Sequence, residues 1–194
     1  MPKRVIIVHR WDGNSAEDWY PWLKSGLEQE GYAVIVPDMP NTAAPKIEDW
    51  IPFLKRQVGS FDRDTYFVGH SIGVQAILRS LETLPEGTQV GGLVSVAGWF
   101  GMNEEVLEEE GALDTAKPWL RDQIEFSKPR RMLGKIIAIF SENDPYAPVS
   151  QADMFKNQLG AETVLVPNRG HFTSMDDVTE APEVLDAVLE MLGS

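Results

Sequence analysis

The amino-acid sequence predicts an α/β protein with a doubly wound, mostly parallel six-stranded sheet. Six short runs of β-branched and aliphatic residues are spread along the 194-residue chain. Stretches with helical periodicity lie between them, so strands and helices alternate. The runs are continuously apolar rather than alternating, which is typical of strands covered by helices on both faces. This order of elements implies right-handed β–α–β crossovers.

Each element is expected from its own pattern. The expected strands are residues 5–8, 33–36, 65–68, 93–96, 136–140 and 163–166. The expected helices carry an apolar stripe at spacings of three and four residues, at 19–27, 47–58, 74–81 and 184–192, with a weaker helix at 151–158. We expect Ser15 and Asp18 to form a capping pair at the start of the first helix, and Gly193 to close the last one.

The length suits a single domain over residues 1–194, with the sheet and its helices but no large cap domain. Residues 99–133 interrupt the alternation, because they hold many charges, Pro118 and Pro129, and a broken apolar pattern. We expect short helices there that pack at the C-terminal edge of the sheet, as a small lid or a substrate-recognition segment.

The composition excludes several classes of function. A net charge of −13 and a pI near 4.6 argue against binding to nucleic acid or to an anionic membrane surface. The chain has no cysteine, which excludes disulfides, thiolate catalysis and zinc–thiolate sites. The apolar run after the basic N-terminus spans only Val5 to Val8, which is too short for a signal peptide. No stretch approaches the roughly 18 apolar residues of a membrane span. We therefore expect a cytoplasmic protein.

The pentapeptide Gly-His-Ser-Ile-Gly at residues 69–73 directly follows the third strand and opens a helix. That context is what the G-x-S-x-G nucleophile elbow requires. The turn lifts the Ser71 hydroxyl above the sheet edge and places the Ile72 N–H at the positive end of a helix, where it stabilises an oxyanion. The alternative is a glycine-flanked turn that carries an N-cap serine. The flanking strand and helix favour the elbow.

The chain order of serine, acid and histidine selects the other members of a Ser-His-Asp triad. His171 follows the sixth strand and is the expected general base, unless it is an ordinary surface-loop histidine. Asp144 follows the fifth strand and is expected to orient His171, although Asn-Asp-Pro is also a turn signal. Glu142 is the alternative acid, but it lies closer to the strand.

The loop after the first strand, residues 9–15, is expected to supply a second oxyanion amide, that of Trp11. The alternative is a plain strand-to-helix connection. Aromatic residues in the loops at this edge are expected to line an apolar substrate pocket, although ordinary packing explains each of them too. These residues are Trp11, Trp99, Phe100, Tyr146 and Phe172, of which Trp99 and Tyr146 have the best claim.

Together with the elbow, several further segments resemble the small serine hydrolases typified by retinoblastoma-binding protein nine and bacterial YdeN. The resemblance covers nearly the whole chain, and it rests on Ile7-Val8-His9, Asp18-Trp19-Tyr20-Pro21-Trp22-Leu23, Met39-Pro40-Asn41, Glu48-Asp49-Trp50, the fifth-strand aspartate loop and Gly170-His171-Phe172. It implies a minimal α/β-hydrolase fold with strand order 2-1-3-4-5-6. The ligand crevice then lies where the winding reverses, between strands one and three.

One departure from the family pattern concerns the oxyanion loop. The family usually has His-Gly where this chain has His9-Arg10. Glycine allows positive φ and close backbone approach, and arginine resists both. Either the loop follows a conformation that arginine tolerates, or the oxyanion hole is altered. The Arg10 side chain either reaches into the site, where it favours an acidic or carbonyl-rich substrate, or projects to solvent and pairs with an acidic neighbour.

These residues predict a serine hydrolase that cleaves small esters through an acyl-enzyme, with a carboxylesterase expected first and an amidase or peptidase as variants. No cofactor and no metal are expected, since H-E-x-x-H is absent, and the expected partner is a small-molecule substrate. A second hypothesis is a binding or scaffold protein with a weak or inactive site, which Arg10 favours. A third, a nucleotide-binding α/β protein, lacks both a Walker loop and a G-x-G-x-x-G turn.

Overall fold

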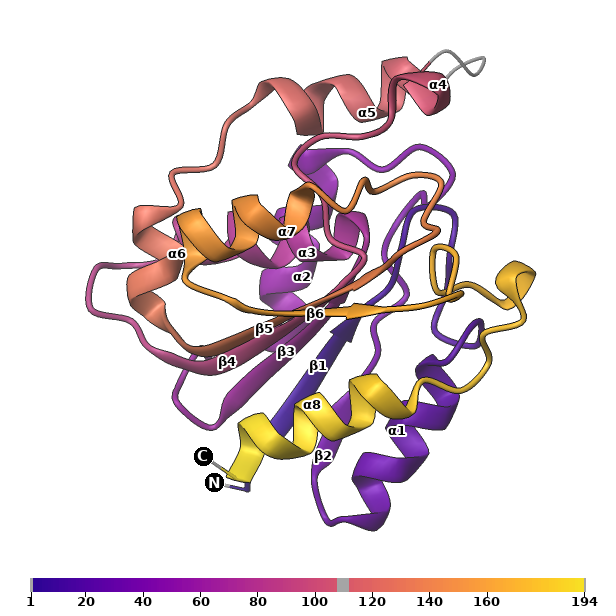
Figure 1. The fold of residues 1–194 in the computed structure, drawn as a ribbon. Helices are drawn as coiled ribbons and strands as arrows, with labels where there is room; N and C mark the ends of the chain where they lie inside the picture. The colour runs from indigo at the N-terminus through magenta and orange to yellow at the C-terminus, as the bar shows by residue number, and fades with distance from the viewer. Residues whose placement is uncertain (1, 108–111, 194) are drawn as a thin grey trace.

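The computed structural model describes residues 2–107 and 112–193. Its centre is one six-stranded sheet in the order β2-β1-β3-β4-β5-β6, and all neighbouring strands are parallel (Figure 1). The strands are β1 (Arg4–Val8), β2 (Ala33–Ile35), β3 (Thr65–His70), β4 (Val90–Val96), β5 (Leu133–Ser141) and β6 (Glu162–Val166). The fold class and the strand order predicted from the sequence are confirmed.

Helices cover both faces of the sheet and create two hydrophobic cores (Figure 1). The helices are α1 (Tyr20–Gln29), α2 (Ile47–Val58), α3 (Ile72–Glu82), α4 (Glu104–Leu107), α5 (Ala112–Arg121), α6 (Ser127–Met132), α7 (Gln151–Met154), the π-helix η1 (Phe155–Leu159), the 3₁₀-helix η2 (Ser174–Asp176) and α8 (Pro182–Gly193). Apolar side chains of α2, α3 and η1 pack on one face of the sheet, and those of α1 and α8 pack on the other. Each amphipathic stripe thus buries its apolar side chains against the strands.

Strand β6 is more exposed to solvent than its sequence predicts. Its continuous apolar run predicts burial on both faces, yet Val164 is 40% exposed and Leu165 is 49% exposed. The strand lies at the edge of the sheet and pairs only with β5, so fewer neighbours surround it than surround a central strand. Hydrophobic sequence alone does not distinguish an edge strand from a central one.

The predicted capping pair of Ser15 and Asp18 is wrong. Helix α1 begins at Tyr20, and its N-cap residue, Trp19, makes no side-chain capping bond. Asp18 has a φ of 52° and directs its carboxylate to Arg10 instead. A carboxylate is attracted more strongly by a charged guanidinium than by a neutral backbone N–H of a helix.

Residues 99–133 form short helices, as the broken pattern predicts, apart from residues 108–111, which lie outside the described residues. The segment is held at two points: the Asn103 N–H donates to the carbonyl of Tyr146, and the Trp119 indole donates to the carbonyl of Pro45. The first of these bonds sets the start of the segment beside the loop that follows β5. A role for this segment as a lid or recognition wall stays a prediction.

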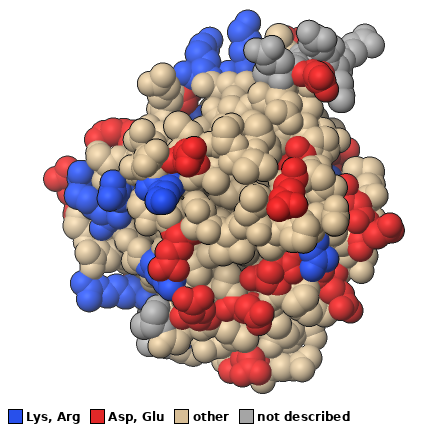
Figure 2. All heavy atoms as spheres, in the orientation of Figure 1, with Lys and Arg blue, Asp and Glu red and all other residues tan. Residues whose placement is uncertain are grey.

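The acidic excess of the sequence is visible on the molecular surface. On the face in Figure 2, Asp and Glu side chains are spread over the right-hand and lower parts, while Lys and Arg side chains gather on the left and at the top. Within the described part of the chain, no helix is long and apolar enough to cross a membrane.

Candidate active site

The elbow joins β3 to α3 at Ser71. This residue has φ 54° and ψ −122°, a backbone conformation that non-glycine residues adopt only under strain. Its N–H donates to the carbonyl of Val96 at 2.9 Å, which fixes the turn to β4. A Cβ added to Gly69 would lie 2.8 Å from the Cα of Val74, so a side chain does not fit between strand and helix. The strand–turn–helix geometry expected at residues 69–73 is present.

His171 and Asp144 form a buried pair beside the elbow. The Nδ1 of His171 lies 2.9 Å from Oδ2 and 3.0 Å from Oδ1 of Asp144, and their side chains are 8% and 1% exposed. The N–H of Tyr146 donates to the same carboxylate at 2.8 Å and orients it further. Glu142, the alternative acid, is exposed to solvent. The geometry therefore favours Asp144 as the partner of His171.

Asp176 holds the loop that carries His171. Its carboxylate accepts hydrogen bonds from the N–H of His171 at 3.0 Å and from the hydroxyl of Thr173 at 2.7 Å. Thr173 and Asp176 also form a capping box at the start of η2. The Thr-x-x-Asp spacing is a sequence signal for this arrangement, and the sequence analysis missed it.

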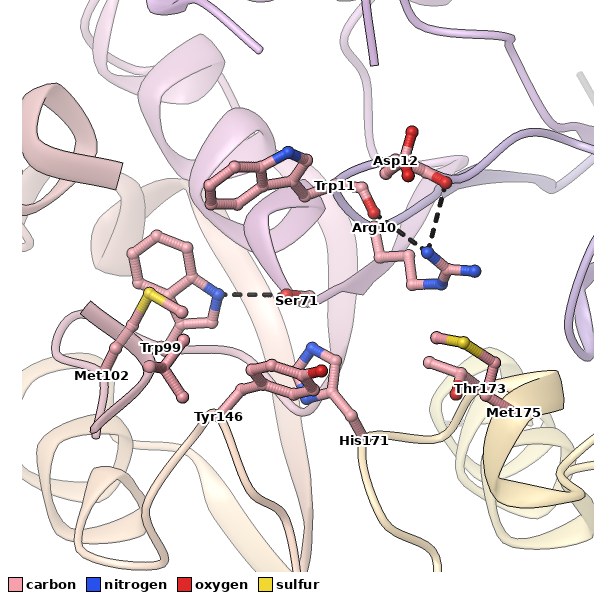
Figure 3. A pocket seen from close by; sticks show the side chains of 11 residues that line it. Arg10, Trp11, Asp12, Ser71, Trp99, Met102, Tyr146, His171, Thr173 and Met175 are labelled. Carbon is pink, nitrogen blue, oxygen red and sulfur yellow. Dashed lines mark hydrogen bonds between the residues drawn. The ribbon is translucent and has the colours of Figure 1, made fainter. Parts of the chain in front are cut away.

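A pocket of about 300 Å³ opens at the carboxyl end of the sheet (Figure 3). It is lined by Arg10, Trp11, Asp12, Ser71, Trp99, Met102, Val106, Tyr146, His171, Thr173 and Met175. The pocket thus brings together Ser71, His171, Arg10 and three of the five aromatic residues expected to line it, which are Trp11, Trp99 and Tyr146. The apolar lining residues Met102, Val106 and Met175 were not predicted, because they come from separate segments that meet only in the folded chain.

Phe172 does not line this pocket, contrary to the prediction. It is fully buried in the core under α1 and α8, and its carbonyl accepts a hydrogen bond from the Trp19 indole at 3.0 Å. Its φ of 58° turns its side chain to the opposite side of the loop from His171. Phe100 is also directed elsewhere, since it stacks on Phe155 with ring centroids 4.8 Å apart.

The Ser71 hydroxyl has an unexpected partner. Its Oγ accepts a hydrogen bond from the indole Nε1 of Trp99 at 3.0 Å (Figure 3). Among the described residues, no hydrogen bond joins Ser71 to His171. The serine–histidine contact of a working triad is therefore not made in this conformation, although both groups face the same pocket.

The two backbone amides expected in the oxyanion hole belong to Ile72, at the head of α3, and to Trp11, in the loop after β1, and their role stays a prediction. The Ile72 N–H belongs to the first turn of α3, where amides have no acceptor within the helix. In the loop after β1, the neighbouring amides are occupied: the Arg10 N–H donates to the Tyr20 hydroxyl at 3.2 Å, and the Asp12 N–H donates to the carbonyl of Thr42 at 2.8 Å. The Trp11 indole donates to the carbonyl of Ala43, which fixes this residue at the pocket rim.

Comparison with known proteins identifies the family. A model of the family described as serine hydrolase matches residues 5–190. The chain belongs to the serine hydrolase family. It is 32% identical to YdeN of Bacillus subtilis over 97% of this chain and 95% of that protein, and 29% identical to the serine hydrolase RBBP9 of Rattus norvegicus over 98% and 96%.

Solved structures agree with this assignment. The crystal structure of the YdeN product from B. subtilis has a TM-score of 0.90 at 28% identity, and the match covers 99% of this chain and 100% of that one. Est1E from Butyrivibrio proteoclasticus has a TM-score of 0.71 at 17% identity, over 100% of this chain and 90% of that one, which shows a shared fold. The family resemblance predicted from the sequence is confirmed.

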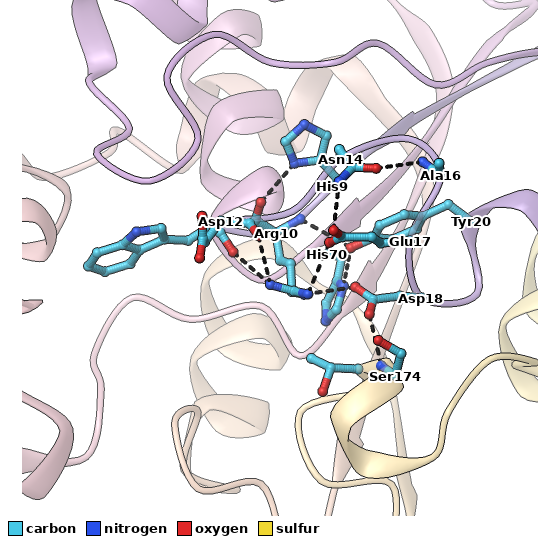
Figure 4. A network of polar contacts seen from close by, with 12 residues as sticks. His9, Arg10, Asp12, Asn14, Ala16, Glu17, Asp18, Tyr20, His70 and Ser174 are labelled. Carbon is cyan, nitrogen blue, oxygen red and sulfur yellow. Dashed lines mark hydrogen bonds and ion pairs between the residues drawn. The ribbon is translucent and has the colours of Figure 1, made fainter.

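In this serine hydrolase, Arg10 takes up a conformation that an arginine tolerates. The residue with positive φ in its loop is Asp12, at 52°, and not Arg10. The guanidinium is only 13% exposed, and its Nε donates to Oδ2 of Asp18 at 2.7 Å (Figure 4). Its Nη1 donates to the carbonyls of Trp11 and Asp12, and its Nη2 donates to Glu17 at 3.4 Å. Arg10 pairs with acidic neighbours, as one interpretation of the sequence holds, but inside the protein rather than in solvent.

Asp18 connects the oxyanion loop to the loop of His171. Besides the bond from Arg10, its carboxylate accepts the N–H of Ser174 at 2.8 Å, three residues beyond His171 (Figure 4). Burial alone would raise the pKa of Asp18, but the hydrogen bonds from Arg10 and Ser174 outweigh it and hold the pKa below its usual value. The carboxylate is therefore charged, and this ion pair ties together two loops that border the pocket.

His70 makes a second connection under the serine hydrolase pocket. Its Nε2 donates to the carbonyl of His171 at 2.7 Å, and its Nδ1 accepts the hydroxyl of Tyr20 at 2.6 Å. Tyr20 in turn accepts the N–H of Arg10. Burial, reinforced by the nearby His171, lowers the pKa of His70 to about 3, so the ring is neutral and can keep this pattern of one donor and one acceptor. The oxyanion loop, elbow and histidine loop are thus joined by buried hydrogen bonds.

Proposed function

We propose that this serine hydrolase is a carboxylesterase that cleaves small esters, with Ser71 as nucleophile, His171 as general base and Asp144 as the acid that orients it. The observation that carries the proposal is the meeting of three chain segments in one pocket. The elbow presents Ser71 at the head of α3, His171 lines the same pocket from the loop after β6, and Asp144 in the loop after β5 is paired with His171.

The reaction is an acyl transfer in two steps. The Ser71 hydroxyl turns toward His171, transfers its proton to the imidazole Nε2 and attacks the ester carbonyl. The amides of Ile72 and Trp11 stabilise the tetrahedral oxyanion. Asp144 stabilises the imidazolium, which then protonates the leaving alcohol. Water repeats the attack on the acyl-enzyme, with His171 again as base, and releases the acid.

The pocket supports small acyl groups. Its volume is about 300 Å³, at the lower end of the range for small-molecule sites, and Met102, Val106 and Met175 contribute apolar side chains to its lining. The guanidinium donors of Arg10 are already bound to protein oxygens, which argues against their use for an acidic substrate. Amides and peptides would follow the same chemistry with a poorer leaving group. The reacting partner is a small molecule, and a cytoplasmic location suits an acidic protein of this kind.

Labelling with a fluorophosphonate probe tests the nucleophile. The wild type is expected to label stoichiometrically, and Ser71→Ala is expected to lose all labelling. Ser25→Ala is the matched control, because Ser25 is exposed on α1, outside the pocket, and should label like the wild type. Asp144→Asn should lower kcat for p-nitrophenyl acetate by about 10³- to 10⁴-fold.

The alternative is a non-catalytic binding protein, and one observation favours it. The Ser71 hydroxyl is bonded to Trp99, and no hydrogen bond to His171 exists among the described residues. Absence of labelling in folded wild-type protein would establish this alternative and refute the esterase. Equal labelling of the wild type and Ser71→Ala would also refute the assignment of the nucleophile.

A further inference from the structure

The hydrogen bond between Trp99 and Ser71 joins two buried groups whose positions are fixed. Trp99 is 1% exposed and Ser71 is 5% exposed. The carbonyl of Trp99 accepts a hydrogen bond from the side chain of Gln75 on α3 at 3.0 Å, so the indole is tied to the same helix that presents the serine. Next to it, Gly98 packs so tightly that an added Cβ would lie 2.7 Å from the Phe155 ring. The indole N–H is therefore a pre-organised donor in the pocket wall.

Attack on a substrate breaks this hydrogen bond. Staggered rotamers of a serine are 120° apart, and a turn from one to the next moves the hydroxyl oxygen by roughly 2 Å. When Ser71 Oγ turns toward His171, the buried Trp99 N–H loses its acceptor. A buried donor without an acceptor is unfavourable, so the step is easier when another acceptor takes the vacated position.

Among the described residues, Ser71 Oγ is the acceptor that the structure gives to the Trp99 N–H. Met102, which lies beside Trp99, has no oxygen in its side chain (Figure 3), and neither has Val106, which also lines the pocket. The Thr173 hydroxyl is on the opposite side of the pocket and is bound to Asp176. The acceptor must therefore come from the substrate or from water.

We propose that Trp99 is a specificity-determining residue that selects esters of 2-oxygenated acids, such as 2-alkoxy and 2-hydroxy acids. In such an ester an oxygen lies two bonds beyond the carbon that Ser71 attacks, close to the position that Oγ has just left. The Trp99 N–H transfers from Oγ to this oxygen as the nucleophile turns. The inference rests on the proposed esterase function and assigns its acyl specificity.

Two substrates that differ by one atom provide the test. p-Nitrophenyl methoxyacetate and p-nitrophenyl butyrate have acyl groups of the same length, with an ether oxygen in place of one methylene. Their kcat/KM values are measured for the wild type and Trp99→Phe, and each is divided by the rate of hydroxide hydrolysis to remove intrinsic reactivity. The wild type should prefer the methoxyacetate, and this preference should fall about 5- to 30-fold in Trp99→Phe, the usual effect of one hydrogen bond.

Two further variants control for effects on folding and on tryptophan loss in general. Trp119→Phe is the control, because this buried indole donates to Pro45 and lies outside the pocket, and its substrate preference should equal that of the wild type. If Trp99→Phe does not fold, 3-benzothienylalanine at position 99 keeps the ring shape and removes only the N–H.

Failure of the Trp99 specificity and failure of the esterase activity give different experimental results. An unchanged preference in the Trp99 variants overturns the inference, because water then satisfies the indole. An equal loss of both rates also overturns it, since the indole would then act on the oxyanion or on Ser71 itself. Absence of fluorophosphonate labelling and of hydrolysis in the wild type overturns the esterase proposal and the inference with it.

Discussion

Replacement of Arg10 by glycine removes the centre of the ion-pair network. Asp18 would keep a charged carboxylate whose side chain is 0% exposed, without its cationic partner and with the N–H of Ser174 still bonded to it. Removal of one member of a buried ion pair costs about 3 kcal/mol at the lower end of the usual range. We use the lower end because the Arg10 side chain is still 13% exposed, which lets some water in.

That loss has a measurable effect on stability. For a chain of this length, 1 kcal/mol corresponds to roughly 2–4 °C, so Arg10→Gly should lower Tm by about 6–12 °C. Asp18→Asn should also be destabilising, because it leaves the guanidinium without its main counter-charge. The double variant removes both charges and should be at least about 2 kcal/mol more stable than the sum of the two single effects.

Urea denaturation at pH 7 of all four proteins completes the cycle. Arg121→Ala is the matched control, because its pair with Asp122 is exposed, with side chains 72% and 51% accessible, and it should change stability by less than about 0.5 kcal/mol. Additive effects of Arg10→Gly and Asp18→Asn would refute the argument that the two residues act as a pair.

The same variant also reports on the oxyanion loop. Arg10 holds the carbonyls of Trp11 and Asp12, so its loss should loosen the Trp11 amide. Removal of a complete oxyanion donor costs about 10²- to 10³-fold, and a displaced one should cost about 10-fold in kcat/KM. Faster turnover in Arg10→Gly would mean instead that the arginine distorts the loop.

Two other predictions concern buried groups. Because the pKa of His70 is about 3 in the folded protein and near 6.5 in the unfolded chain, its contribution to stability is complete above pH 6.5 and is lost as the pH falls toward 3. At pH 5 this shift lowers the free energy of unfolding by about 2 kcal/mol. In urea denaturation, the free energy of unfolding of His70→Asn should therefore fall less than that of the wild type when the pH is lowered from 7 to 5. An equal fall in both proteins would contradict the lowered pKa of His70. Gly73→Ala should fail to fold or lose several kcal/mol of unfolding free energy, because the added Cβ would collide with the carbonyl of Val8. Gly193→Ala is the control, because its Cβ would meet open space, and its Tm should equal that of the wild type. Equal melting temperatures for the two alanine variants would show that the elbow tolerates a side chain.

Local pattern was sufficient for much of the fold. The strands, the main helices and the elbow each arise from short-range rules, since apolar runs, helical stripes and glycine spacing all lie within about ten consecutive residues. Chain order then predicted a triad of Ser71, Asp144 and His171. In the structure Ser71 and His171 line one pocket and Asp144 is bonded to His171, while their catalytic roles stay a prediction. Family resemblance supplied the strand order, which no local pattern contains.

The sequence by itself determined the α/β class and the candidate residues for the chemistry, because both depend on spacing along the chain. Only the tertiary structure decided what those residues contact. Phe172 and Trp99 are both aromatic residues in loops, yet the first packs into the core and the second donates to Ser71. Arg10 has acidic neighbours in sequence, but its pairing with Asp18 inside the protein depends on the placement of the loop against α1. Burial and partner choice are set by residues far apart in the chain, and for that reason the environment of the serine became known only with the fold.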